Sequence, residues 1–129
     1  MENKFIEIFT GLKRDYGYAD INSAYKDPST GKLKLKYGWA AKELLESDYL
    51  DHLTGKKSIG IQPCNDDGLA KFGAIDIDSD EYDNFDLRKY LEIIDKKNIP
   101  VVPVKSKSGG LHIYVFFKEP VKASFVRNF

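Results

Sequence analysis

Two stretches of the chain repeat apolar residues at the three- to four-residue spacing of one helix face. The apolar positions are Phe5, Ile8, Phe9 and Leu12 in the first stretch and Leu87, Tyr90, Leu91 and Ile94 in the second. The second stretch also ends in a polar, basic turn and is followed by a proline, which are stop signals. The pattern predicts helices over residues 2–14 and 84–97.

Strands are predicted where apolar residues alternate with polar ones or form short runs. These segments are residues 32–37, 58–62, 71–78, 101–105 and 111–117. Pro103 removes one donor from the fourth of these strands, so this strand should lie at a sheet edge or a bulge.

The remaining segments carry weaker patterns. Residues 16–31 read mostly as a loop with a turn at 27–31, and residues 39–53 read as one or two short helices. A last helix should begin at Pro120. Together these expectations describe an α+β fold.

Composition fits a globular protein. The chain has 129 residues, of which 42% are apolar and 31% charged, typical of one domain. No apolar run approaches the ~20 residues of a membrane span, and no signal-peptide pattern opens the chain, so we expect a cytoplasmic protein with no membrane partner. Cys64 is the only cysteine, which excludes an internal disulfide, and a zinc site would have to recruit His52 and His112 with carboxylates.

Charge is balanced overall but unevenly distributed. The chain has 20 basic and 20 acidic residues. Residues 66–86 hold eight acidic residues and one lysine, whereas residues 87–129 hold nine basic and three acidic residues. An acidic strand end beside a basic segment suits joint binding of a metal ion and a polyphosphate, and solvated surface charge is the alternative.

The strand at 71–78 ends in two aspartates, Asp76 and Asp78, separated by one residue. Alternation places both on one face, about 7 Å apart along the strand. Two such carboxylates can share a hard divalent cation, Mg²⁺ or Mn²⁺. The alternative is an amphipathic strand with a solvated polar face.

A glycine-rich basic turn precedes the strand at 111–117. It contains Ser106, Lys107 and Ser108 before two glycines, whose backbone can come close to a phosphate. His112 follows at the start of the strand and suits a donor to a triphosphate oxygen. A tight hairpin with a surface histidine explains the same residues.

Tyr114 and Phe116 share the face of His112. They could stack on bases if exposed, but packing on the sheet is the expected role.

The order of these motifs resembles the archaeo-eukaryotic primase superfamily, which includes primase-polymerases. It is most similar to the primase domain of TOTE conflict systems and its phage and plasmid relatives. The resemblance rests on four features in order: a strand ending in hydrophobic-Asp-hydrophobic-Asp, a helix, an edge strand, and Ser-x-Ser-Gly-Gly-x-His at the start of another strand. Similar segments cover nearly the whole chain: residues 8–12, 52–55, 59–63, 72–78, 106–112 and 116–121.

The resemblance implies a fold. It predicts a palm built on an RRM-like βαββαβ unit, here βαββα with the last strand missing, in a mixed or antiparallel sheet. A small N-terminal α/β portion would precede it. Residues 1–129 would then form one domain, with a helical portion at 1–57 and an incomplete catalytic palm at 58–129.

The resemblance also implies template-directed nucleotidyl transfer, in DNA replication or repair or in mobile-element replication. By analogy, Asp76 and Asp78 bind catalytic Mg²⁺ or Mn²⁺. A primer 3′-hydroxyl or an initiating nucleotide would attack the α-phosphate of a dNTP or NTP on a DNA template. The residues expected to contact the phosphates are Ser106, Lys107, Ser108 and His112, helped by Lys105.

One family feature has no counterpart in the sequence. Family members carry a third acidic motif after the second palm helix, and Asp80 and Asp83 lie too close to the first motif to be assumed substitutes. We therefore expect a C-terminal remainder, a helicase or another partner chain to complete the domain. A catalytically incomplete nucleotide- or nucleic-acid-binding fragment is the main alternative, and a metal-dependent nuclease is a third reading.

Overall fold

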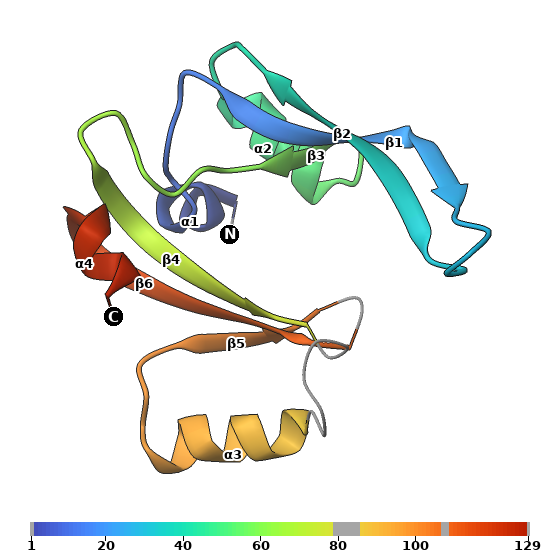
Figure 1. The fold of residues 1–129 in the computed structure, drawn as a ribbon. Coiled ribbons are helices and arrows are strands. Elements are labelled where there is room, and N and C mark those ends of the chain that lie inside the picture. The colour runs from blue at the N-terminus through green and yellow to red at the C-terminus, as the bar shows by residue number, and fades with distance from the viewer. Residues whose placement is uncertain (1, 79–85, 107–108, 129) are drawn as a thin grey trace.

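The computed structural model describes residues 2–78, 86–106 and 109–128 (Figure 1). Within these residues the chain is α+β, with two three-stranded antiparallel sheets and four helices. Helix α1 (Glu2–Ile8) lies between the two sheets. No helix in the described part of the chain is long and apolar enough to cross a membrane.

The first sheet has β1 (Tyr16–Lys26) at its centre, antiparallel to β2 (Leu33–Ala40) on one side and to β3 (Ser58–Gly60) on the other. The strands predicted at 32–37 and 58–62 are confirmed. The loop predicted over 16–31 is wrong, because pairing with two neighbours stabilises a strand that is polar and lacks clear alternation. The helical portion expected at 1–57 therefore contains two strands as well as helices.

The turn predicted at 27–31 is confirmed between β1 and β2. Asp27 Oδ1 accepts hydrogen bonds from the backbone N–H groups of Ser29 at 2.8 Å and Thr30 at 3.1 Å. Gly31, with φ of 67°, takes the left-handed conformation that glycine adopts without strain. Hydrogen bonds from Lys34, Ser29 and Thr30 hold the pKa of Asp27 well below its usual range.

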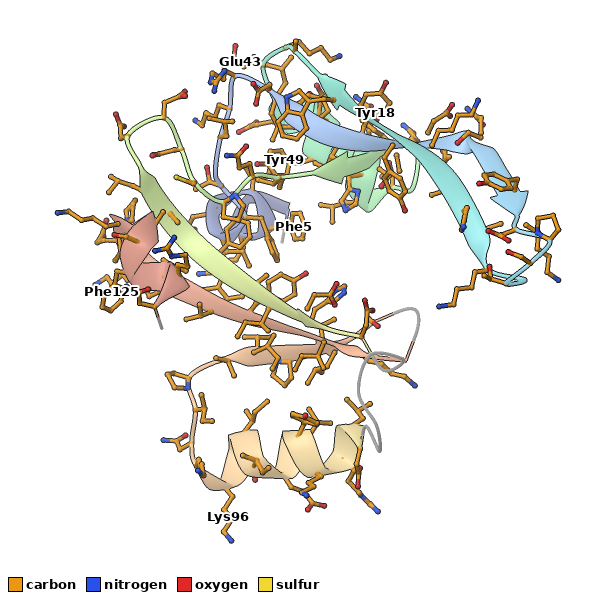
Figure 2. All side chains as sticks on the ribbon, in the orientation of Figure 1. Phe5, Tyr18, Glu43, Tyr49, Lys96 and Phe125 are labelled. Carbon is orange, nitrogen blue, oxygen red and sulfur yellow. The ribbon has the colours of Figure 1, made fainter. Side chains whose placement is uncertain are left out.

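The core of the N-terminal half lies between the first sheet and α2 (Glu46–Leu53). Tyr16, Leu44 and Tyr49 are buried there. Phe5 of α1 packs against Tyr49, with ring centroids 6.4 Å apart, and Figure 2 shows both side chains in the space beneath the first sheet. Helix α2 is shorter than the helical segment predicted over 39–53, because the start of that segment continues β2.

Helix α1 ends six residues before the predicted end at residue 14. The chain after it runs against residue 62, and Leu12 N–H donates to Gln62 O at 2.9 Å. A Cβ atom at Gly11 would lie 2.1 Å from the same carbonyl oxygen. This close backbone approach, which requires glycine, replaces the helical hydrogen bonds that the periodicity predicted.

The second sheet contains β4 (Leu69–Ile77), β5 (Val102–Lys105) and β6 (Leu111–Lys122). Its strand order is β4-β6-β5, so the two strands joined by α3 (Leu87–Lys96) are separated by β6. This is a split β-α-β arrangement, as expected for an RRM-like palm. Pro103 lies in edge strand β5, as predicted.

Two helices accompany this sheet. Helix α3 confirms the helix predicted at 84–97, and Asp86 caps it by accepting a hydrogen bond from Lys89 N at 3.2 Å. Helix α4 (Ala123–Arg127) follows β6, which continues two residues past Pro120, so the last helix begins later than predicted.

Candidate functional site

Register across the β4–β6 ladder brings Asp76 and His112 together. These two residues are direct partners, whereas Ile75 pairs with Ile113 on the opposite face of the sheet. His112 Nε2 lies 3.2 Å from Asp76 Oδ1. Both side chains are accessible, Asp76 at 65% and His112 at 39%, so a ligand could reach them from solvent.

Aromatic side chains pack beside His112 on the same face of the sheet. The ring of Tyr114 meets the imidazole edge-on, with centroids 6.3 Å apart. Tyr114 stacks on Phe116 at 5.9 Å, and Phe9, which directly follows α1, contacts both rings edge-on. Tyr114 and Phe116 are half-buried in this cluster, which confirms the packing role expected for them.

The three strands of the sheet end together beside this pair. Leu111, the first residue of β6, pairs with Ile77 of β4 and with Lys105 of β5. The register therefore brings Asp78, which directly follows β4, and Ser106, which directly follows β5, to the same end of the sheet as His112. The predicted site segments at 76–78 and 106–112, which are far apart in the sequence, meet at one end of the sheet.

The turn after β5 is held by its own backbone. Ser106 is buried, and its N–H donates to Gly110 O at 3.0 Å, while Gly109 N–H donates to Ser106 O at 3.2 Å. Gly109 has φ of 93°. Lys107 and Ser108 lie outside the described residues, and Lys105 is exposed at the end of β5.

The carboxylates fit a hard divalent cation by their chemistry. Asp76 presents exposed oxygen atoms, and Asp78 follows two positions later, at the end of the same strand. Among the described side chains, no group of three or more His, Cys, Asp or Glu residues is arranged to hold a metal ion. Two carboxylates would leave most coordination positions to substrate and water, and Asp80 and Asp83 lie outside the described residues.

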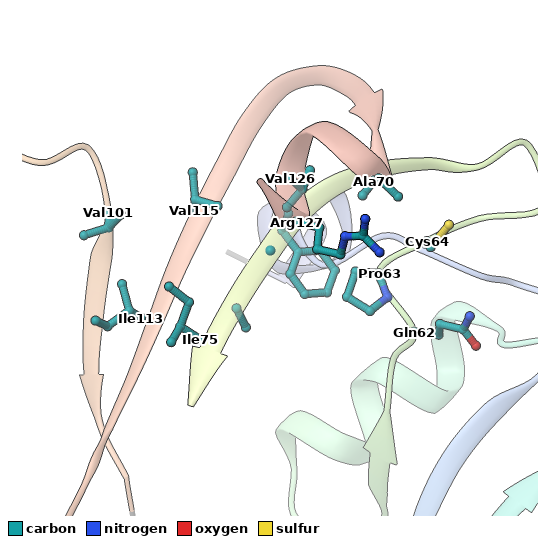
Figure 3. Close-up of a pocket in the computed structure, with 14 residues that line it drawn as sticks. Gln62, Pro63, Cys64, Ala70, Ile75, Val101, Ile113, Val115, Val126 and Arg127 are labelled. Carbon is teal, nitrogen blue, oxygen red and sulfur yellow. The ribbon is translucent and has the colours of Figure 1, made fainter. Parts of the chain in front are cut away.

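An apolar pocket lies elsewhere, over the opposite face of β4 and β6 (Figure 3). It has a volume of about 460 Å³ and a mainly aliphatic lining that includes Ile75, Ile113, Val115 and Val126. The register puts these β4 and β6 residues on the face away from Asp76 and His112. The apolar pocket is therefore separate from the polar candidate site.

Two exposed aromatic rings on the first sheet were not predicted from the sequence. Tyr37 is 81% exposed and Trp39 is 54% exposed on β2. The assignment of Trp39 to a helix hid this pair, although the alternation in residues 33–39 already places both rings on one face of a strand.

Comparison with known proteins agrees with the order of the motifs. None of the curated proteins compared matches this chain. The family model described as the TOTE conflict system archaeo-eukaryotic primase domain matches residues 13–129, which include both sheets and every candidate site residue. This chain, with its split β-α-β sheet and its aspartate–histidine pair at the strand ends, belongs to the TOTE conflict system archaeo-eukaryotic primase domain family.

Proposed function

We propose that this chain carries the nucleotide-binding part of a primase-polymerase site, which extends or initiates a strand on a DNA template by metal-dependent nucleotidyl transfer. Membership of a primase family supports the reaction class. The observation that carries the proposal is the pairing of Asp76 with His112 beside the Ser106–Gly110 turn, at the common end of three strands. This arrangement combines acidic and phosphate-binding groups at one accessible edge.

Each residue has a distinct proposed role. Asp76 and Asp78 would hold Mg²⁺ or Mn²⁺, which when bound would stabilise the charge that develops on the attacking and leaving oxygens. An N–H at His112 Nε2 can donate to Asp76 or to a phosphate oxygen of a dNTP or NTP. The Tyr114 ring keeps the imidazole at the surface of the sheet, where a triphosphate can reach it.

The turn after β5 would receive the phosphates. Its two glycines allow close approach of a ligand to the backbone, and Gly109 already adopts a positive φ. Ser106, Lys107 and Ser108 would supply hydroxyl and ammonium donors around it, whereas Lys105 pairs with Leu111 and so lies on the face of the sheet opposite His112. This function requires a DNA template-primer as a partner. It also requires a helicase or another chain segment that completes the acidic set.

Calorimetry of dNTP and NTP binding, with and without Mn²⁺, tests the proposal. We expect metal-dependent binding by the native chain and its loss in Asp76→Ala and His112→Ala. Asp67→Ala is the matched control, since Asp67 is an exposed aspartate in the turn before β4, away from the strand ends. Binding that survives both site substitutions would refute the assignment.

The two alternatives give different results in the same preparation. A catalytically incomplete fragment would bind nucleotide but fail to extend a labelled primer, and adding the missing partner would restore extension. A nuclease would shorten labelled DNA in the presence of Mn²⁺ and without nucleotide. Loss of this shortening in Asp76→Ala would replace the polymerase assignment with hydrolysis.

A further inference from the structure

Strand β2 leaves one edge of the first sheet without a partner. It is the outer strand in the order β2-β1-β3, and no other strand among the described residues pairs with it beyond β1. The irregularity of the β1–β2 ladder lies in β1, between Asp20 and Tyr25, so β2 runs without interruption from Leu33 to Ala40. In Figure 1 the hairpin of β1 and β2 extends away from the second sheet, which therefore does not cover this edge.

The backbone groups that face this edge can be identified. Lys36 N–H donates to Ser23 Oγ, on the β1 side, at 2.7 Å. Because neighbouring residues of a strand direct their N–H and C=O groups to opposite sides, those of Leu35, Tyr37 and Trp39 point away from β1. A row of unpaired N–H and C=O groups is a template for pairing with another strand.

The side chains of β2 divide into an apolar face and a basic face. Alternation places on one face only apolar residues, which are Leu33, Leu35, Tyr37 and Trp39. Tyr37 is 81% exposed, and Leu33 and Trp39 are each more than half exposed. Exposed apolar side chains along an open edge strand mark an interaction surface.

Charge on the other face limits the ways in which two copies of this edge can pair. In an antiparallel pair of β2 strands, the outward groups bond only when odd-numbered residues lie opposite odd-numbered ones. A two-fold axis at Leu35 would put Lys34 opposite Lys36 of the other copy, and an axis at Lys36 would put the two Lys36 side chains together. Like charges directly opposite each other are destabilising. An axis at Tyr37 gives the longest pairing in which no lysine faces a lysine, with residues 34–40 of each copy opposed.

The register centred on Tyr37 also gives Lys36 a favourable neighbour. Lys36 of one copy lies opposite Gly38 of the other. The Tyr18 ring covers Gly38, since a Cβ atom there would be 2.6 Å from Tyr18 Cζ, and this ring is 40% exposed. The ammonium of Lys36 can therefore reach the exposed Tyr18 ring of the other copy and form a cation–π contact.

We infer that two copies of this chain associate through β2, antiparallel about a two-fold axis at Tyr37, to form one six-stranded sheet. On the apolar face the two Tyr37 side chains meet at the axis, and Leu35 of each copy lies opposite Trp39 of the other, as in stabilising cross-strand pairs. The other edge strand, β3, has only three residues, so the assembly closes at two copies. The inference is independent of the proposed function, because it involves neither Asp76 nor His112.

Sedimentation equilibrium of the native chain over a concentration series tests the association. We expect a reversible monomer–dimer equilibrium, with dimer present below about 1 mM. A native chain that stays monomeric throughout this range overturns the inference.

Substitutions at the axis test the register, because residue 37 of one copy faces residue 37 of the other. Tyr37→Lys and Tyr37→Glu should each weaken dimerisation at least about 10-fold, since each places like charges together. An equimolar mixture of the two variants should restore the dimer, because opposite charges then meet. The circular dichroism of each variant should match that of the native chain, since Tyr37 is exposed and its replacement leaves the fold intact.

Ile21→Lys is the matched control. It adds the same charge at an exposed apolar position of the same hairpin, on β1 and away from the β2 edge, and it should dimerise like the native chain. Weakened dimerisation of both Tyr37 variants, its restoration in their mixture and its retention in Ile21→Lys support the inference. Unchanged dimerisation of either Tyr37 variant, a mixture that stays monomeric, or an equal loss in Ile21→Lys overturns it.

Discussion

His112 and Asp76 face each other across the β4–β6 ladder, with Nε2 of the histidine 3.2 Å from Oδ1 of the aspartate. Because both side chains are accessible, the pair contributes little to stability. We predict that Asp76→Ala and His112→Ala each change the free energy of unfolding by less than about 1 kcal/mol, measured by urea denaturation. A loss of more than about 2 kcal/mol in either variant would indicate a structural pair and weaken the functional assignment.

Gly11 gives a sharper prediction about the fold. A Cβ atom at this position would meet Gln62 O at 2.1 Å, where backbone must shift to make room. Gly11→Ala should therefore destabilise the chain by about 1–3 kcal/mol in urea denaturation, as overpacking does. Gly60→Ala is the control, since its Cβ would have only ordinary contacts and its stability should stay near that of the native chain. Equal stability of the two variants would contradict the close approach.

A buried charged group links α2 to the first sheet and gives a pH prediction. Asp48 accepts hydrogen bonds from Leu45 N–H at 2.9 Å and Tyr16 Oη at 3.2 Å, and it pairs with Lys57. Burial acts to raise the pKa of Asp48, but the bonds from Lys57, Leu45 and Tyr16 outweigh it, so the pKa is lowered. The hydrogen bond to Asp48 raises the pKa of Lys57.

The signs follow from these directions. A carboxyl whose pKa is lower in the folded state stabilises the fold above its unfolded pKa of about 3.9, and this contribution disappears as pH falls below that value. The raised pKa of Lys57 stabilises the fold below about pH 10.4, and that contribution disappears as pH rises further. Asp48→Ala should lose about 2 kcal/mol at pH 7.

Urea denaturation between pH 2 and 7 checks this prediction. On acidification the native chain should lose the stability that the Asp48 carboxylate contributes, and Asp48→Ala lacks this contribution at every pH. The plots of unfolding free energy against pH for the two proteins should therefore converge at low pH. Asp51→Ala is the matched control, because its pair with Lys56 is long, at 3.8 Å, and exposed. It should change stability by less than about 1 kcal/mol at any pH. Parallel curves for Asp48→Ala and the native chain would refute the role of Asp48.

Elements whose own apolar pattern reflects their burial could be predicted from the sequence, whereas elements formed by contacts with distant segments could not. The strands around Asp76 and His112 were predictable, because their alternation reflects one buried and one accessible face. The pairing of those two residues could not be predicted, because it depends on the register between β4 and β6. The placement of Asp78 and Ser106 at the same end of the sheet depends on the strand order β4-β6-β5. Neither the register nor the strand order is encoded in the pattern of a single segment. Strand β1 escaped prediction because ladder bonds to β2 and β3 form it rather than its own apolar pattern.

Phe9 connects the two halves of the chain, and its removal makes the last prediction. Its ring contacts Phe72 at 5.2 Å, Tyr114 at 5.5 Å and Phe116 at 5.3 Å, while its carbonyl oxygen accepts a hydrogen bond from Tyr49 Oη at 3.0 Å. The second sheet thus packs on the ring that directly follows α1, and a long ion pair between Lys71 and Glu7, at 3.8 Å, is a second link between β4 and α1. Phe9→Ala should cost about 3 kcal/mol.

The same variant should also separate the unfolding of the two sheets. Trp39 fluorescence reports only on the first sheet, whereas far-ultraviolet circular dichroism reports on both, so the two probes should coincide in the native chain and diverge in Phe9→Ala. Phe9→Leu, which keeps most of the apolar volume, should lose less than about 1.5 kcal/mol. Phe125→Ala, at an exposed ring on α4, should lose less than about 1 kcal/mol. A single transition of Phe9→Ala at the native midpoint would show that the sheets are joined by other contacts than this ring.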